Sequence, residues 1–345
     1  MKLFVSVVSV AVRPFFAVLI ITIDSNLRVI NCKVVCRNQR VFGLCRHGEM
    51  IAAVGCDYNT AGTITLIDPR TDSVVDSFRA RPALDRRHQE GKTAPGADAW
   101  GHVHGIKSFL SGFTIVNTIA DSLVVVKADN SYSYSVNLFK FCRDLGVRGA
   151  IYGRHSLDSN YYHFNSVLLD RDSPAFYVLG HNTKSPDRSF VVKGRREAGD
   201  NTTGGLPRLV PDTIWRNLGT DSSPNSGKQC HDLLKSRGLI YYSESANSAI
   251  SVLDENGKAS QVVKDRKFGY VRGLDVCGSI LFAGSSNFRT AATRFLDDSL
   301  VVHDASHAPA VLCIDAETRD LRSVIELRSL CGGLDCEIRD IVATV

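Results

Sequence analysis

The sequence carries none of the short motifs that identify common enzyme classes. It has no glycine-rich phosphate-binding loop, no His-Glu-x-x-His zinc motif and no serine in a nucleophile-elbow context. The formal net charge is only +5 over 345 residues, and the basic residues are scattered without a long run. Proteins that bind nucleic acids gather Lys and Arg on one face, so this distribution argues against a nucleic-acid partner.

Long apolar runs are missing as well. The N-terminal segment is apolar, but Arg13 and Pro14 divide it into runs of about ten residues, which are too short to span a bilayer. No convincing small-residue cleavage site follows, so a secretory signal is the weaker alternative and we predict no membrane partner. The Val, Ile and Phe content of this segment favours β-strands.

Cysteines are too sparse for a disulfide scaffold. The chain has ten, and most lie inside apolar runs, which is typical of small buried side chains in a reducing compartment. We therefore predict a cytoplasmic protein. Two pairs, Cys32 with Cys36 and Cys331 with Cys336, have spacings that come close to zinc and disulfide patterns without matching them. The sequence leaves the state of these four thiols open.

What the sequence does contain is a repeated unit rich in β-forming residues. A small or acidic residue followed by an aliphatic one recurs at Gly43, Gly105, Ser166, Asp232, Gly273 and Asp340. A turn and a second β-rich run follow the first five copies, and hairpins such as residues 62–80 supply a third and a fourth strand. Units of four strands that repeat every 40 to 70 residues, roughly, are typical of propeller blades.

The sixth unit is completed by the other end of the chain. It has a single strand, within residues 337–345, whereas residues 1–36 hold three strands without a first. We therefore predict an all-β fold, a six-bladed β-propeller of four-stranded antiparallel blades that forms one domain over residues 1–345. Its last blade combines residues 1–36 with 337–345, and this closure removes the edges that an open sheet would expose.

Histidine and arginine recur where the innermost strands begin. The residue before each small or acidic position would face the central channel, and so would the residue two positions earlier, because alternate residues of a strand share a face. The first set is Phe42, His104, Asn165, His231, Arg272 and Arg339, and the second contributes His102 and His163. Asp232 and Asp340, one residue further on, are expected to point away from the axis.

These side chains suggest an axial pocket. Neutral imidazoles suit a divalent transition metal, and the candidate ligands for one such ion are His102, His104, His163 and His231. Arg272 and Arg339 offer planar forks of donors to a small anionic molecule. Without a metal, His104 or His231 would act as base or nucleophile while the two arginines stabilise negative charge. The candidate catalytic residues are therefore His104, His231, Arg272 and Arg339.

Long connections reach the same face as the blade starts. They span residues 80–101, 142–162, 220–229 and 287–309, and loops gathered on one face are typical of a binding surface. Trp100 and Arg289 lie in two of these connections. We assign both to ligand binding, together with His163 and Asn165.

Three segments resemble known propellers. "YVRGLDVCGSILFAGSSNFR", which begins at Tyr270, and the closing "EIRDIVATV" resemble a bacterial propeller group of uncharacterised function. "HFNSV" and "CHDLL" resemble, more distantly, arylsulfotransferase-type propellers, which implies sulfuryl transfer by an axial His and Arg. Strictosidine synthase-like and lactonase-type propellers are wider relatives that hold calcium with axial Glu, Asn and Asp. The His and Arg of this chain depart from that pattern.

Two functions stay open. The first is a propeller whose His/Arg-lined axial pocket binds a small anionic ligand, with or without a metal; if it is an enzyme, it is a transferase, a lyase or a hydrolase. The second is a non-catalytic scaffold for a protein partner. No Trp-Asp pair recurs along the chain, which weakens the scaffold alternative.

Overall fold

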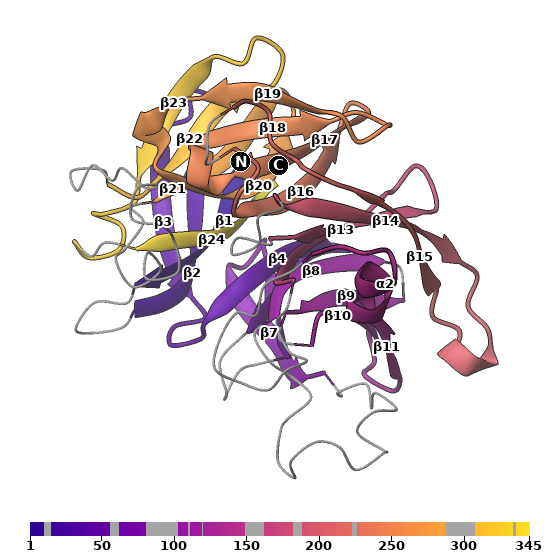
Figure 1. The fold of residues 1–345 in the computed structure, drawn as a ribbon. Coiled ribbons are helices and arrows are strands. Elements are labelled where there is room, and N and C mark those ends of the chain that lie inside the picture. Colours follow the sequence, from indigo (N-terminus) through magenta and orange to yellow (C-terminus); the bar gives the residue numbers. More distant parts are fainter. Residues whose placement is uncertain are drawn as a thin grey trace.

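The computed structural model describes residues 1–9, 15–55, 62–80, 103–109, 111–118, 120–148, 162–181, 188–222, 226–286, 308–333 and 336–345. They form six four-stranded antiparallel sheets (Figure 1). The innermost strand of each sheet contacts the innermost strand of the next, and the sixth contacts the first, so the sheets close into a ring. The predicted all-β, six-bladed propeller is confirmed.

The first three blades follow one another along the chain. The first consists of β4 (Val41–His47), β5 (Met50–Gly55), β6 (Thr63–Asp68) and β7 (Ser73–Arg79). The second consists of β8 (Val103–Phe109), β9 (Gly112–Asn117), β10 (Ser122–Lys127) and β11 (Ser133–Asn137), followed by the short helix α2 (Leu138–Asp144). The third consists of β12 (Phe164–Leu169), β13 (Ala175–Gly180), β14 (Phe190–Glu197) and β15 (Arg208–Trp215).

The remaining blades complete the ring. The fourth consists of β16 (Cys230–Ser236), β17 (Leu239–Glu244), β18 (Ala249–Leu253) and β19 (Ala259–Lys264). The fifth consists of β20 (Tyr270–Cys277), β21 (Ile280–Ser286), β22 (Ala310–Asp315) and β23 (Leu321–Glu326). The sixth consists of β24 (Glu337–Thr344), β1 (Lys2–Ser9), β2 (Phe15–Ile23) and β3 (Val29–Val35).

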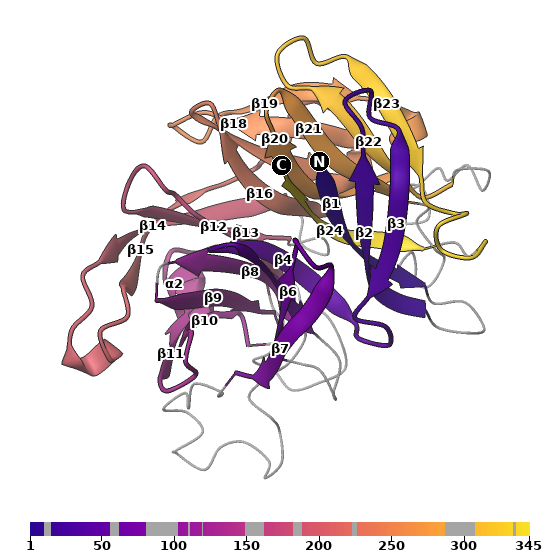
Figure 2. The same cartoon turned by 180° about the vertical axis from the view of Figure 1, so that it is seen from behind.

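The sixth blade joins the two ends of the chain, as predicted. Strand β1 pairs antiparallel with β24, with Lys2 opposite Thr344 and Val5 opposite Ile341, and Figure 2 shows the two termini side by side. Side chains on both faces of β1 are buried, which explains why the N-terminal segment is so apolar. Within the described ranges, no helix is long and apolar enough to cross a membrane.

The core lies between neighbouring blades. Leu3 and Ile338 of the sixth blade, for example, belong to the same buried cluster as Phe282 and Val311 of the fifth. Inner and middle strands are covered on both faces by adjacent blades and therefore carry near-continuous apolar runs. The outermost strands border solvent, and Val75 on β7 is 50% exposed. This layering places the polar residues of the inner strands at the central axis.

Each innermost strand has a shifted register at the repeated small or acidic position. The shifts fall between Val41 and Gly43, Val103 and Ile106, Phe164 and Ser166, His231 and Leu234, and Arg272 and Leu274, and in β24 between Ile338 and Asp340. Such β-bulges set an extra residue against one on the partner strand and re-aim the local side chains. The six inner strands therefore do not follow simple alternation where they line the axis.

Close approach of adjacent inner strands explains the small residues of the repeat. A Cβ atom on Gly43 would lie 3.0 Å from the carbonyl oxygen of His104, and one on Gly105 would lie 3.2 Å from that of Asn165. Gly273 also needs a left-handed backbone, with φ of 75°. A larger side chain at these positions would push neighbouring blades apart.

Candidate functional site

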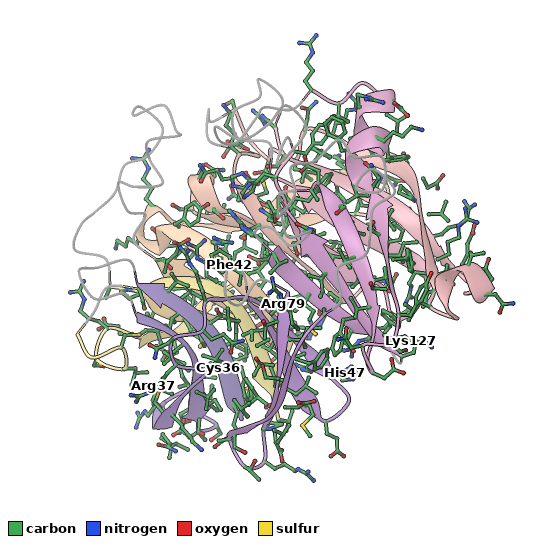
Figure 3. All side chains as sticks on the ribbon, turned by 90° about the horizontal axis from the view of Figure 1, so that it is seen from below. Cys36, Arg37, Phe42, His47, Arg79 and Lys127 are labelled. Atoms are coloured by element: carbon green, nitrogen blue, oxygen red, sulfur yellow. The ribbon has the colours of Figure 1, made fainter. Side chains whose placement is uncertain are left out.

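Six rings stand in succession around the axis, and we call them the axial ring. Its members are Phe42, His104, His163, His181, His231 and Tyr270. Successive ring centroids lie 5.0, 5.0, 4.9, 4.7 and 5.5 Å apart in that order. Phe42 is the second residue of β4 and lies close to the middle of the molecule in Figure 3, whereas Arg37 and Lys127 lie toward its outside. Four of the six members are imidazoles contributed by blades two, three and four.

A charged bridge lies beside the two ends of the axial ring. Nη1 of Arg272 lies 3.1 Å from Oε1 of Glu337, and Nη2 of Arg339 lies 2.6 Å from Oε2 of the same carboxylate. The guanidinium of Arg339 also stacks over Phe42 at 4.4 Å from the ring centroid. The carboxylate of Glu337 is thus contacted by both guanidiniums.

The structure brings most of the predicted site residues together. His104, His163 and His231 belong to the axial ring, and Arg272 and Arg339 belong to the charged bridge. Asn165 is buried beside them and donates from Nδ2 to the carbonyl oxygen of Cys230 at 3.0 Å. His102, Trp100 and Arg289 lie outside the described residues. The roles assigned to all these side chains stay predictions.

Sequence reasoning missed three members of the site. His181 follows β13, the second strand of its blade, and its backbone N–H donates to the carbonyl oxygen of His163 at 3.2 Å. A hairpin register drawn across blade three would have placed these two histidines opposite each other. Tyr270 and Glu337 each lie two residues before a predicted arginine, so the rule that paired His102 with His104 would have found them.

Burial keeps two of the imidazoles neutral. It lowers the pKa of His231 well below the usual value, and the nearby Arg272 adds to the effect. It also lowers the pKa of His181, to which His163 and Arg272 contribute. At neutral pH each of these two rings therefore has one nitrogen that donates and one that accepts.

Hydrogen bonding assigns the tautomer of His231. Its Nδ1 lies 2.8 Å from the carbonyl oxygen of Gln229 and 2.8 Å from the hydroxyl of Ser245. That hydroxyl donates to the carbonyl oxygen of Val271 at 2.5 Å, so both neighbours of Nδ1 accept. The proton must therefore sit on Nδ1, and Nε2 carries the free lone pair.

Three buried polar atoms in this region make no hydrogen bond within the described part of the chain. They are Oδ1 of Asn165, Oε1 of Gln229 and Nε of Arg272. Leaving such an atom unsatisfied costs about 1–3 kcal/mol, and the great majority of buried polar groups have a partner. Two acceptors and one donor are therefore available here to a bound molecule or to water.

Beneath the axial ring, two carboxylates line a small cavity, contrary to our expectation that they would point away. Asp232 and Asp340 border this space together with His104, Lys107 and Asn165, and it has room for about one water molecule. The prediction was wrong because the bulges break the alternation of the strands. Asp232 has a left-handed backbone, with φ of 58°, and the extra residue in β24 directly precedes Asp340.

These carboxylates tie adjacent blades together. Oδ2 of Asp232 accepts from the backbone N–H of Gly273, and Oδ2 of Asp340 accepts from that of Leu44, each at 2.7 Å. Burial raises the pKa of Asp340 to about 7, an effect that Lys107 partly opposes. Burial also raises the pKa of Asp232, which Arg272 partly opposes. Burial therefore favours the protonated form of both carboxylates.

A metal site remains a prediction. Among the residues that the structure describes, no group of three or more His, Cys, Asp and Glu side chains is arranged to hold a metal ion. His104, His163 and His231 lie along an arc with His181 inserted before the last, instead of converging on one point. The fourth proposed ligand, His102, lies outside the described residues.

Comparison with known proteins identifies the fold and no family. No family model and no curated protein sequence matches the chain. A chain in the crystal structure of a nidogen/laminin complex is similar, with 10% identity, a TM-score of 0.58, and 99% of this chain and 97% of that one covered. A protein of unknown function from Bacteroides caccae gives 9% identity, a TM-score of 0.52 and the same coverage.

Identities this low show the fold alone. They confirm the predicted six-bladed propeller and, at the level of fold, the resemblance to an uncharacterised bacterial propeller. The more distant resemblance to arylsulfotransferase-type propellers finds no support in these two structures.

Proposed function

We propose that the axial site binds a small molecule with a carboxylate, sulfate or phosphate group, held by Arg272 and Arg339. The observation that carries the proposal is that two nearly buried guanidiniums converge at the axis, where both contact the carboxylate of Glu337. Their side chains are only 5% and 14% exposed, so water solvates them poorly. Nε of Arg272 makes no hydrogen bond within the described residues, and guanidinium forks suit an anion geometrically.

The neighbouring atoms suggest what else the ligand carries. Asn165 and Gln229 each present a buried acceptor without a hydrogen bond in the described residues, and Nε2 of His231 is a third acceptor. An anion that also bears hydroxyl or amine donors would satisfy these atoms. We therefore favour a hydroxylated or amino-substituted anion over a simple inorganic one.

A catalytic role is the stronger form of this proposal. Nε2 of His231 has the free lone pair that a base or nucleophile needs, and the arginines would stabilise charge that develops on the substrate. His104 would act beside it. Group transfer, elimination and hydrolysis all use such a constellation, so a transferase, a lyase or a hydrolase fits.

Location and metal content belong to the same proposal. Cys45, Cys142, Cys230 and Cys313 are buried as small apolar side chains, which supports a reducing, cytoplasmic compartment. A transition metal would be held by His104, His163 and His231 with His102. Metal analysis of the purified protein before and after chelation tests this part. Retention of about one equivalent supports it, and none at all contradicts it.

Calorimetric titration with phosphate, sulfate, hydroxy acids and amino acids tests the anion site. Arg272→Gln and Arg339→Gln should each weaken binding at least about tenfold, because each removes a charge-assisted hydrogen bond. Arg237→Gln is the matched control, since Arg237 pairs with Glu317 at 2.7 Å on the exposed surface. An equal loss in the control variant would overturn the proposal.

A scaffold for a protein partner is the alternative. The chain from the nidogen/laminin complex shares this fold and comes from a structure of a protein–protein complex. Failure of the folded wild-type protein to bind any member of the anion panel would favour this alternative.

A further inference from the structure

Two cysteines approach each other where the chain enters its closing strand. The Sγ atoms of Cys331 and Cys336 lie 3.3 Å apart, and the two residues are only 3% and 4% exposed. A disulfide needs a sulfur separation of about 2.05 Å, so the two sulfurs must approach by about 1.2 Å. The pair lies between β23 and β24, in the connection from the fifth blade to the sixth.

The sequence of this connection explains the approach. The backbone N–H of Cys331 donates to the carbonyl oxygen of Leu327 at 2.9 Å, and that of Gly333 donates to the carbonyl oxygen of Arg328 at 2.8 Å. Gly332 and Gly333 have φ of 67° and 80°, a region that glycine enters without strain. The turn therefore folds back and presents Cys331 to the start of β24.

We propose that Cys331 and Cys336 form a reversible disulfide, a redox modification site on the strand that closes the ring. The sulfurs are nearly buried, so the oxidant that fits is a small one of the peroxide class. The thiolate of Cys331 attacks one peroxide oxygen and breaks the O–O bond, giving a sulfenic acid and hydroxide, which takes up the proton that the thiol had released and becomes one water. The thiol of Cys336 then attacks that sulfur, forming the S–S bond and releasing the second water. Excess small thiol restores both S–H groups.

The surroundings favour Cys331 as the attacking thiol. Its hydrogen bond with Cys336 lowers the pKa of Cys331, against the effect of burial. By contrast, burial raises the pKa of Cys36 to about 11. Because the thiolate is the reactive form, Cys331 should react before Cys36 although it is less exposed.

Oxidation of this cysteine pair should change anion binding at the axis. This expectation rests on the proposed anion site. Cys336 directly precedes Glu337, whose carboxylate holds Arg272 and Arg339. Closing the S–S bond moves the start of β24 and with it this carboxylate. Anion affinity should therefore differ between the reduced and the oxidised protein.

Peptide mapping tests the disulfide directly. No Lys or Arg separates the two cysteines, so trypsin releases both in one peptide, residues 329–339. The folded protein is treated with limiting hydrogen peroxide, denatured, alkylated and digested. We expect this peptide to appear without alkyl groups and lighter by two hydrogen atoms before Cys36 loses its thiol. Treatment of the oxidised protein with dithiothreitol before alkylation should return the doubly alkylated peptide. A peptide that links only after unfolding would overturn the proposal.

Two serine variants separate this pair from a neighbouring thiol. Cys32 packs against the same cluster as Cys331 and Cys336. Cys32→Ser should leave the internal link unchanged, whereas Cys331→Ser should abolish it. A cross-link between Cys32 and residues 329–339 in the wild type would overturn the assignment.

Anion titration of the two forms tests the coupling. A change in affinity of about threefold or more between them supports it, and equal affinities contradict it. If neither form binds an anion, the proposed anion site is wrong. The peptide masses test the disulfide independently of that result.

Discussion

Two buried polar regions of this propeller differ in how completely they are satisfied. In blade four the fully buried carboxylate of Glu244 accepts five hydrogen bonds of 2.7 to 3.2 Å, from Thr220, Ser226, Gly227, Asn247 and Ser251. At the axis, two arginines share one carboxylate, and Asn165 and Gln229 each keep an acceptor without a hydrogen bond in the described residues. Both regions bury charged side chains. They differ in whether the polar atoms of the region all have hydrogen-bond partners.

This difference distinguishes buried polar groups that stabilise the fold from buried polar groups that are available to a ligand. The donors around Glu244 come mainly from the connection before β16 and from the third strand of its blade, so the carboxylate fixes that connection in place. A complete donor set leaves nothing for a ligand to add. The axial set is incomplete, and an incomplete set in a buried location is what a binding site needs before its ligand arrives.

The largest expected effect is on stability at Glu244. Glu244→Gln replaces one accepting oxygen by an N–H₂ group that faces donors, so it should lower the free energy of unfolding by about 3 kcal/mol. Urea unfolding measures this change. Glu317→Gln on the exposed surface is the control. A loss below about 1 kcal/mol at Glu244 would remove the contrast between the two regions.

Arg272→Gln should show the reverse pattern. Glu337 keeps its ion pair with Arg339, so the free energy of unfolding should change by less than about 1 kcal/mol. Anion affinity should nevertheless fall at least about tenfold. Urea unfolding and titration of the same preparation check both values. A large loss of stability with unchanged affinity would place Arg272 with Glu244, as a structural residue.

Stability should depend on pH through Asp340. Its pKa is raised to about 7 from an ordinary 3.8, so the folded state holds a proton that the unfolded state has lost between these values. Stability should therefore fall as pH rises from about 4 to about 7. The groups around it are Lys107, which lowers this pKa, and Asp232, which raises it.

Asp340→Asn isolates that dependence. The variant keeps an oxygen for the backbone N–H of Leu44 and loses the titration, so its unfolding free energy should vary less over this range. Thermal unfolding at several pH values measures the slopes. Equal slopes in the two proteins would show that another group is responsible.

The smallest expected effect is at Ser245. Ser245→Ala removes one of the two acceptors at Nδ1 of His231, but the carbonyl oxygen of Gln229 still fixes the tautomer. We expect a loss of about 1 kcal/mol in stability and little change in anion affinity. Nitrogen NMR of the imidazole reports which nitrogen is protonated. A switch to the Nε2 tautomer would contradict our assignment.

The sequence repeat predicted the fold and much of the site. The residues that it misplaced or missed have physical explanations. Arg272 and His231 were found because a small or acidic residue marks each inner strand where adjacent blades crowd together. Asp232 was misplaced because a bulge breaks the alternation of strand faces, and our prediction treats the repeated small or acidic position as part of a regular strand. His181 was missed because it follows the second strand of its blade, and only the hairpin register shows that this position lies opposite His163 at the axis.

The pairing of β24 with β1 also has a consequence for how the protein is made. Glu337 and Arg339 reach the axis on β24, whereas their partners Phe42 and Arg272 are synthesised much earlier. The strands of the first five blades all precede β24 in the chain, but the charged bridge cannot assemble until β24 has been synthesised and has paired with β1. Anion binding at the axis therefore requires that all six blades have been synthesised and that the ring has closed.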